Sequence, residues 1–233
     1  MPSTPDDDTA QFDATPMKVL LVEDHELLAG TLAMALRQQG LEVHATAGPS
    51  AAAVVDLART LAPVLVLLDL DLGPAVGSGL DLIRPLAETG ARVVMVTGVT
   101  DRARLGACLE AGAVGVVSKA TEFSVLIDTV HRALQGAPLL REDERQALLD
   151  AARARRRADH DRLAPFDALT PKEQAVLVHL LAGESAEAIA ERSYVSLATV
   201  RSHIRAILLK LGVNSQLAAV ALARNAGWSL KEE

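Results

Sequence analysis

The chain contains few cysteines and few aromatic residues. Its 233 residues include one cysteine, Cys108, and Phe, Trp and Tyr together make up 2%. A single cysteine cannot close an internal disulfide, which excludes a disulfide framework and fits a reducing compartment. Packed cores must therefore consist of Leu, Val, Ile and Ala, and the hydrophobic half of the chain supplies enough of them.

Long hydrophobic runs and a signal sequence are also missing. The longest apolar runs, such as the one around Leu65–Leu68, fall far short of the roughly 18–20 residues that a membrane span needs. Residues 1–16 have no basic start and no apolar middle, and they carry Asp6, Asp7, Asp8 and Asp13. We expect a disordered acidic tail over 1–16 and a soluble, cytoplasmic protein with no membrane partner.

The chain has no excess of basic charge, because its formal net charge is −7. The acidity is uneven: residues 1–135 hold 17 acidic and 9 basic side chains, whereas residues 169–233 hold 6 acidic and 7 basic ones. Binding to nucleic acid would therefore depend on a local patch rather than on the overall field of the protein.

Residues 17–135 alternate between short apolar segments and stretches with helical periodicity, the last of these near 122–135. Continuous apolar strands are typical of a parallel sheet that is covered on both faces. The pattern predicts an α/β domain with a flavodoxin-like, doubly wound, five-stranded parallel sheet. The five expected strands are Lys18–Val22, Leu41–His44, Val64–Leu68, Arg92–Val96 and Val114–Val117.

The rest of the chain divides into a linker and a helical domain. Residues 136–165 are charged and contain Pro138, which predicts a linker that is partly helical around Glu142–Arg157. From 166 to 230 the pattern predicts a small all-α domain of four helices, because capping residues and glycines punctuate it sharply. The expected helices start at Thr170-Pro171, Ser185, Ser196 and Ser215.

Chemistry-bearing residues follow the expected strands. Glu23 and Asp24 follow the first strand, Asp69 the third and Lys119 the fifth, while Thr97 ends the fourth. In a doubly wound sheet these ends converge, and crowded carboxylates are costly unless a cation lies among them. We therefore expect a hard divalent ion, Mg²⁺, beside a nucleophilic Asp69, with the lysine and threonine binding phosphate oxygens.

Four segments carry a family resemblance: KVLLVEDH, VLVLLDLDLG, VVMVTG and VGVVSKA, in this order. Residues 17–135 resemble the receiver domain of two-component response regulators. The resemblance implies that Asp69 is the phosphoacceptor, loaded by a sensor histidine kinase. It implies that Asp24, Asp69 and the backbone carbonyl of Asp71 hold Mg²⁺, with Glu23 assisting, and that Thr97 and Lys119 read the phosphoryl group.

The receiver-like segment departs from the family pattern at three positions. Gly73 replaces a usual proline, which predicts a more flexible loop. Val116, at the switch position, replaces the aromatic residue that commonly swings inward on activation, so signal transmission must differ there. Ala120 follows Lys119 in place of the frequent proline or aspartate.

The third helix expected in the C-terminal domain is amphipathic. Val200, Ile204, Ile207, Leu208 and Leu211 fall on one stripe, and Thr199, Arg201, Ser202 and Arg205 fall on the opposite face. A short helix and the turn Ser193–Ser196 precede it, which is the spacing of a helix-turn-helix. On this pattern alone, a helix-turn-helix and a plain helical bundle with a solvated polar face are equally good readings.

A second resemblance favours the helix-turn-helix. About residues 166–228 are similar to the LuxR-type domain of the NarL/FixJ group, through the T-P-x-E opening, T-V-R-S-H and K-L-G-V. The resemblance implies a homodimer on double-stranded DNA, paired through the last helix at Leu217, Val220 and Ala221. Ala198 and Leu209 stand where basic or polar residues are frequent. The implied DNA contacts are Ser196, Thr199, Arg201, Ser202, Arg205 and Lys210.

Together these features predict a response regulator that is not an enzyme. Phosphorylation at Asp69 would control a dimer that binds DNA and regulates transcription. One alternative is a haloacid-dehalogenase-like phosphatase that uses Asp69 and Asp71 as a D-x-D pair. Another is a receiver with a different output, such as an RNA or protein partner, although scarce aromatics disfavour base stacking on single strands.

Overall fold

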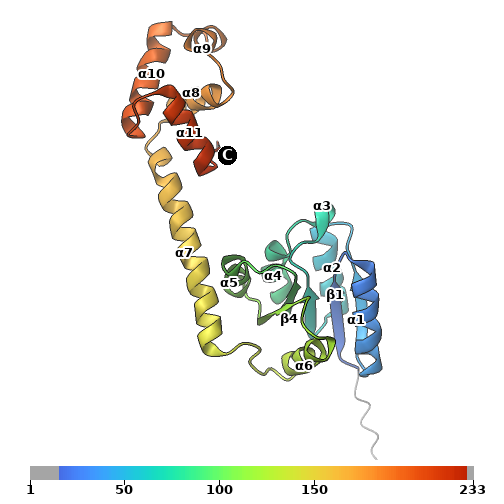
Figure 1. Ribbon diagram of the computed structural model, residues 1–233. Coiled ribbons are helices and arrows are strands. Elements are labelled where there is room, and N and C mark those ends of the chain that lie inside the picture. The colour runs from blue at the N-terminus through green and yellow to red at the C-terminus, as the bar shows by residue number, and fades with distance from the viewer. Residues whose placement is uncertain (1–15, 230–233) are drawn as a thin grey trace, which may run out of the picture. The chain divides into compact units, whose positions relative to one another are not determined.

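The computed structural model describes residues 16–229, so the acidic tail predicted over 1–16 lies almost wholly outside the described residues. The chain forms two compact units that divide between Ala152 and Arg153 (Figure 1). Within 16–229 no helix is long and apolar enough to cross a membrane.

The first unit contains a five-stranded parallel sheet in the order β2-β1-β3-β4-β5. This confirms the predicted fold class, and each strand lies within two residues of its predicted position. All of β3 is buried because helices cover both faces of the sheet. The strands are β1 (Lys18–Val22), β2 (Glu42–Thr46), β3 (Leu65–Leu68), β4 (Arg92–Thr97) and β5 (Gly115–Ser118).

Two apolar clusters hold the helices to the sheet. On one face, α1 (Glu26–Gln38) and α6 (Phe123–Leu134) pack through Leu32, Leu36 and Val130, among others. The opposite face is covered by three helices, and Figure 1 shows the two sets on either side of the strands. These three are α2 (Ala51–Leu61), α4 (Gly79–Ala87) and α5 (Arg102–Ala111), and the short α3 (Gly73–Val76) follows β3.

The linker is more helical than predicted. It forms a 26-residue helix, α7 (Glu142–Asp167), which runs past the expected end at Arg157. Exposed ion pairs along the helix, from Arg155 and Arg162 to Asp159, each add modest support at i,i+3 and i,i+4 spacing. The sequence pattern did not show this extension because the segment is highly polar and has no apolar stripe of helical period.

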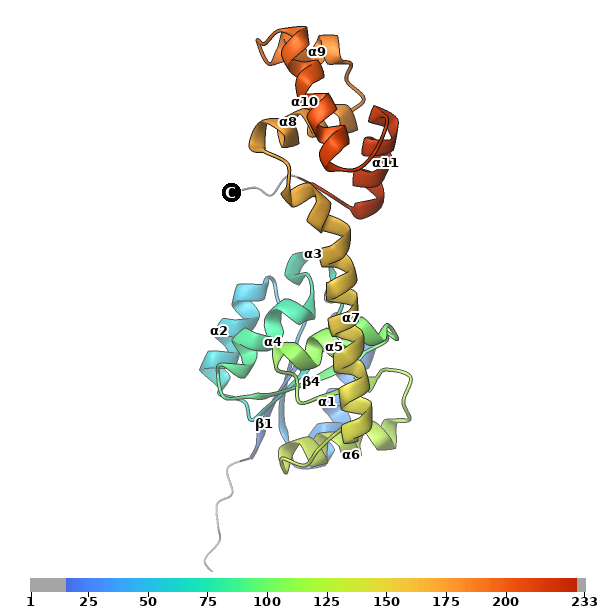
Figure 2. The same cartoon turned by 90° about the vertical axis from the view of Figure 1, so that its left-hand side faces the viewer.

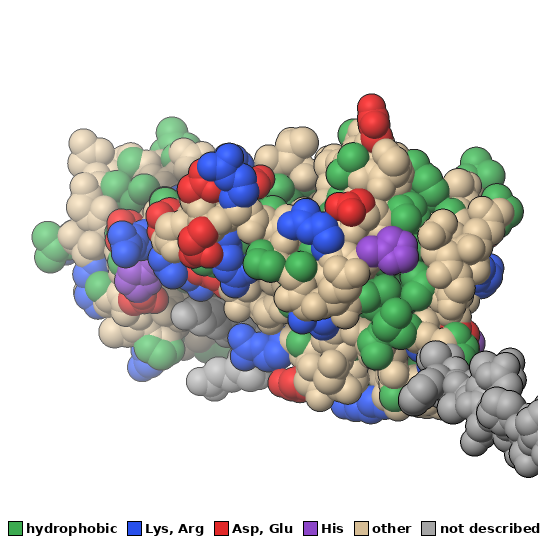
Figure 3. Space-filling model, turned by 90° about the horizontal axis from the view of Figure 1, so that it is seen from below, with side chains coloured by type: hydrophobic (Ala, Val, Ile, Leu, Met, Phe, Trp, Pro, Cys, Tyr) green, Lys and Arg blue, Asp and Glu red, His purple; other side chains and the backbone are tan. Residues whose placement is uncertain are grey.

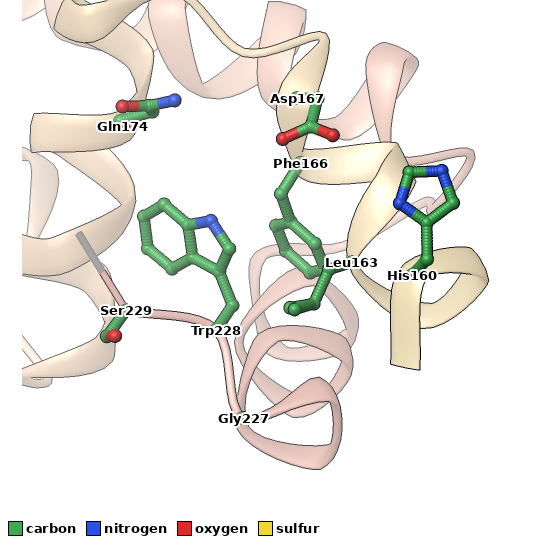
Figure 4. A pocket seen from close by; sticks show the side chains of 8 residues that line it. All are labelled: His160, Leu163, Phe166, Asp167, Gln174, Gly227, Trp228 and Ser229. Carbon is green, nitrogen blue, oxygen red and sulfur yellow. The ribbon is translucent and has the colours of Figure 1, made fainter. Parts of the chain in front are cut away.

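The second unit contains four helices after α7, as predicted: α8 (Pro171–Leu181), α9 (Ala186–Arg192), α10 (Leu197–Lys210) and α11 (Gln216–Ala226). A serine or threonine side chain caps each helix by accepting a backbone N–H. The rings of Phe166 and Trp228 stack with centroids 5.5 Å apart, beside a cavity of about 360 Å³ (Figure 4). Two of the chain's few aromatic side chains therefore fasten the C-terminal segment to the end of α7.

Candidate functional site

The predicted pocket residues lie at the carboxyl edge of the sheet. Glu23 and Asp69 directly follow the neighbouring strands β1 and β3, and the backbone N–H of Asp69 donates to the carbonyl of Val22 at 3.0 Å. On the other side, the N–H of Lys119 donates to the carbonyl of Thr97 at 2.9 Å. Parallel pairing therefore brings together residues that are far apart in the sequence.

The centre of the pocket is an ion-paired triad. The Lys119 ammonium lies 2.8 Å from Asp69 Oδ2 and 2.7 Å from Glu23 Oε2. The side chains of Glu23 and Asp69 are only 2% and 3% exposed, and that of Lys119 is 18% exposed. Burial raises the pKa of Asp69, and the lysine opposes this shift without cancelling it. Burial also acts to lower the pKa of Lys119, but its bonds to the two carboxylates outweigh burial and raise that pKa.

The backbone around Asp69 is held tightly in place. Its Oδ1 accepts the N–H of Leu70 at 2.7 Å. Gly79 packs against its carbonyl so closely that an added Cβ would lie 2.0 Å from the Asp69 carbonyl oxygen. Only glycine fits this position, and it anchors the start of α4 beneath the pocket.

Four side chains of the pocket form a possible metal site. One ligand atom from each of Glu23, Asp24, His25 and Asp69 lies within 4.8 Å of the others. Sequence reasoning did not include His25, although it directly follows the acidic pair. Its Nδ1 lies 2.8 Å from Glu23 Oε1 and 2.9 Å from Asp24 Oδ1, and the hydrogen bond to Glu23 raises the pKa of the histidine.

Asp71 lies apart from this cluster. Its side chain is 63% exposed and pairs with Arg104 of α5 at 2.8 Å. The two carboxylates of the D-x-D sequence therefore have different environments, one buried with Lys119 and the other exposed with an arginine. Nothing in the sequence marked Arg104, because it lies 33 positions further along the chain in a different element.

Thr97 and Val116 lie on adjacent strands beside the pocket. Thr97 is buried, and its Oγ1 accepts the N–H of Val99 at 3.1 Å. Val116 is partly buried against the core cluster that contains α5. Both residues line a cavity of about 290 Å³, so the valine leaves space where the family commonly has an aromatic side chain.

The residues predicted to contact DNA are gathered on and before α10. Ser196 caps the helix, and Thr199, Arg201, Ser202 and Arg205 are exposed along it, as the amphipathic pattern predicted. Arg201 lies 3.2 Å from Glu187 of α9, a partner that sequence reasoning did not identify. An exposed ion pair of this kind is weak and leaves the arginine available to a stronger anion.

Lys210 has a structural partner. Its ammonium lies 2.7 Å from Oε2 of Glu173, which is buried at the start of α8. Glu173 also closes a capping box with Thr170. Burial acts to raise the pKa of Glu173, but the bonds to Lys210 and Thr170 outweigh it and lower that pKa. The T-P-x-E sequence predicted the helix cap but not the ion pair between Glu173 and Lys210.

Among the residues predicted for dimerisation, Leu217 is 79% exposed, Ala221 is exposed and Val220 is partly buried. Leu209 at the end of α10 is 83% exposed. Single exposed leucines are common on protein surfaces, so their exposure alone does not identify a surface for association. The face in Figure 3 mixes acidic, basic and apolar side chains, and neither sign of charge dominates it.

Comparison with known proteins matches both units to families. Residues 19–131 match the response regulator receiver domain, and residues 167–223 match the bacterial regulatory proteins of the luxR family. The nitrate/nitrite response regulator NarP of Escherichia coli is 35% identical over 213 residues, which cover 90% of this chain and 95% of that protein. A homologous nitrate/nitrite response regulator of Haemophilus influenzae is 32% identical, with 88% of this chain and 95% of that protein covered.

Among solved structures, the RcsB–DNA complex aligns with a TM-score of 0.49 and 22% identity over 90% of this chain and 98% of that one. Both family matches fall on the segments whose motifs pointed to them, in the same order. The chain belongs to the two-component response regulators of the NarL/FixJ type, transcription regulators that join a receiver to a LuxR-type DNA-binding domain and are controlled by phosphorylation.

Proposed function

We propose that Asp69 is the phosphoacceptor and that its phosphorylation by a histidine kinase controls DNA binding through α10. The observation that carries the proposal is the buried Asp69 carboxylate at the carboxyl edge of the sheet, bonded to the Lys119 ammonium with further acidic ligands beside it. This arrangement places a nucleophile and a mobile cation in one pocket.

The residues of the pocket fit the transfer step. A carboxylate oxygen of Asp69 attacks the phosphorus of the phosphohistidine, the N–P bond breaks, and an acyl phosphate forms. The Lys119 ammonium then transfers its hydrogen bond from the carboxylate to a phosphoryl oxygen. The Thr97 hydroxyl, which now accepts from Val99, turns to donate to another phosphoryl oxygen. The acyl phosphate carries close to two negative charges in place of the single charge of the carboxylate, and both are paired within the pocket.

The carboxylates also fit a hard divalent cation, and we propose Mg²⁺. Glu23, Asp24 and Asp69 offer side-chain oxygens within a small volume, and the main-chain carbonyl of Asp71 is the further ligand that the family implies. When bound, the ion neutralises charge on the incoming phosphoryl group. The Lys119 ammonium pairs with both buried carboxylates, Glu23 and Asp69, and so balances part of their charge.

The output that we propose is a homodimer on double-stranded DNA. Arg201 and Arg205 lie four residues apart on the exposed face of α10. In a helix-turn-helix, this face of the recognition helix contacts base edges and phosphates. Ser196, Thr199 and Ser202 add hydroxyl donors to phosphates near the helix N-terminus. Lys210 can contribute only by giving up Glu173. The exposed Leu217 and its neighbours on α11 pair the two copies.

A phosphatase is the weaker alternative. A D-x-D phosphatase needs the second aspartate as an acid next to the first, but Asp71 is exposed and bonded to Arg104. The structure therefore offers no buried acid for that role at Asp71. We propose accordingly that the protein has no catalytic turnover of phosphate esters.

The test of the pocket is phosphorylation by a small-molecule phosphodonor, with and without Mg²⁺, followed by intact mass and by size on a column. We expect one phosphoryl group on the wild-type protein, dependence on Mg²⁺, and no adduct on Asp69→Asn. Multiple turnover of a phosphate ester that Asp69→Asn abolishes would support the phosphatase instead. An adduct on another residue would refute the assignment.

The test of the output is selection of binding sites from a pool of random duplexes by the phosphorylated protein. Arg201→Ala should lose more affinity for the selected duplex than for unselected DNA, and equal losses would reduce its role to phosphate contact. Binding should weaken steeply as salt rises. Preference for RNA over the duplex pool would refute the DNA output.

A further inference from the structure

The segment that precedes and begins α7 is seated on the receiver-like unit at two glycines. At Gly106, in the middle of α5, an added Cβ would lie 2.0 Å from the carbonyl oxygen of Leu148 and 3.0 Å from the Cβ of Ala152. Figure 2 looks onto this side, with α7 in front of α5. Such close approach of two helices is possible only where one of them has no side chain.

The second contact lies at the start of β5. An added Cβ on Gly115 would lie 2.6 Å from Cδ1 of Leu139, just before α7. Leu148 and Ala152 are only 4% and 3% exposed, whereas most residues between 141 and 151 are exposed. Residues 139–152, hereafter the strap, are therefore docked by a few small contacts rather than by a broad apolar face.

The strap shares a cavity with Thr97, which we propose to bind the phosphoryl group. One wall of the 290 Å³ cavity consists of Thr97, Val99 and Val116, and Leu140 and Leu148 of the strap line it from the other side. A change in the position of Thr97 or of the loop after β4 therefore changes the surface against which the strap packs.

We propose that the strap is an intramolecular latch: it is docked on α5 and β5 when Asp69 is unphosphorylated and released when Asp69 is phosphorylated. The inference rests on the proposed function of Asp69. To bring its hydroxyl to a phosphoryl oxygen, Thr97 moves relative to Val99, whose N–H its Oγ1 accepts in the unphosphorylated state. This movement shifts the loop that forms one wall of the cavity. Phosphorylation then changes the docking of the linker helix, in place of the aromatic side chain that commonly changes position in this family.

Gly106→Ala tests the docking by itself. The new methyl group cannot coexist with the Leu148 carbonyl, but it suits α5, because alanine is a better helix former than glycine. Gly30→Ala is the matched control, since Gly30 is also inside a helix and an added Cβ there meets nothing within 4 Å. In the unphosphorylated full-length protein, amide exchange over the strap should be at least about tenfold faster in Gly106→Ala than in Gly30→Ala.

A second pair of variants keeps the test valid if Gly106→Ala does not fold. Leu148→Ala removes the buried contact from the strap itself, and Leu149→Ala removes the same side chain from the adjacent, partly exposed position. Only the first should accelerate exchange over the strap. Equal protection in Leu148→Ala and Leu149→Ala would overturn the proposed docking.

Phosphorylation of the wild-type protein, verified by intact mass, then tests the latch. We expect exchange over residues 139–152 to accelerate about as much as in Gly106→Ala, while exchange in α1 stays unchanged. A phosphorylated protein whose strap keeps its protection would overturn the latch and leave the role of Asp69 intact. Failure of Asp69 to accept a phosphoryl group would overturn both proposals.

Discussion

Replacing Lys119 by methionine should destabilise the receiver-like unit when no metal is added. Methionine keeps the length of the side chain but leaves Glu23 and Asp69 buried without a cation. Removing one partner of a buried ion pair costs about 3–5 kcal/mol, and we expect roughly 3 kcal/mol here because the lysine retains some contact with solvent. For a protein of this size, that corresponds to a fall in Tm of roughly 6–12 °C.

The deficit should depend on pH in a defined direction. Burial already raises the pKa of Asp69, and loss of Lys119 removes the group that opposes the shift. A carboxyl group with a raised folded pKa stabilises the fold below its unfolded pKa, and this contribution is lost as pH rises through the folded pKa. The free energy of unfolding of Lys119→Met should therefore be closest to that of the wild type near pH 5 and furthest below it at pH 8.

Chemical denaturation at several pH values, in chelator and in excess Mg²⁺, is the measurement. In a double-mutant cycle, Asp69→Asn should recover about half of the loss, because Glu23 keeps its buried charge. Added Mg²⁺ should restore most of the lost stability in Lys119→Met but little in the double variant. A stability of Lys119→Met that equals wild type in chelator at pH 8 would refute the idea that the lysine compensates the pocket.

Three further outcomes follow from other contacts. Acidification below about pH 4.5 should destabilise the second unit, because the bonds to Lys210 and Thr170 lower the pKa of Glu173. The ionised Glu173 stabilises the fold above its unfolded pKa of 4.5, and this stabilisation is lost as pH falls through the folded pKa. In thermal scans, Glu173→Gln should make Tm less dependent on pH in the acid range. Gly79→Ala should cost about 3 kcal/mol or more in denaturant titration, since its Cβ would overlap the Asp69 carbonyl. Glu187→Gln should raise affinity for duplex DNA at low salt, because Arg201 loses its competing partner, and the gain should vanish in a fluorescence titration at high salt.

The sheet and the pocket were predictable from the sequence for a shared reason. Parallel strands buried on both faces give continuous apolar runs, and their carboxyl ends converge whatever the intervening helices contain. That rule brought Asp69 and Lys119 together across 50 positions of the chain. The charge partners of Asp71 and Glu173 were not predictable. Arg104 beside Asp71 and Lys210 beside Glu173 depend on helix orientation, which apolar periodicity does not fix.

The docked strap could not be predicted either, because it depends on the missing side chains of two glycines, Gly106 and Gly115. In the sequence, Gly106 lies between two expected strands and Gly115 lies within the expected strand Val114–Val117. Their meaning appears only when Leu139 and Leu148 lie where a Cβ would be. The extra length of α7 was missed for a related reason, since its polar sequence carries no apolar stripe.

The same absence of side chains connects the two unusual features of the receiver-like unit. An aromatic residue at position 116 would need space beside Thr97, and the strap occupies one side of that cavity. A small valine and two glycines therefore belong to one arrangement, in which the space that a swinging ring would use is bounded by the linker instead. On this reasoning, introducing tyrosine at Val116 would not restore a familiar switch. It would compete with Leu140 and Leu148 for the cavity and push the chain toward the undocked strap.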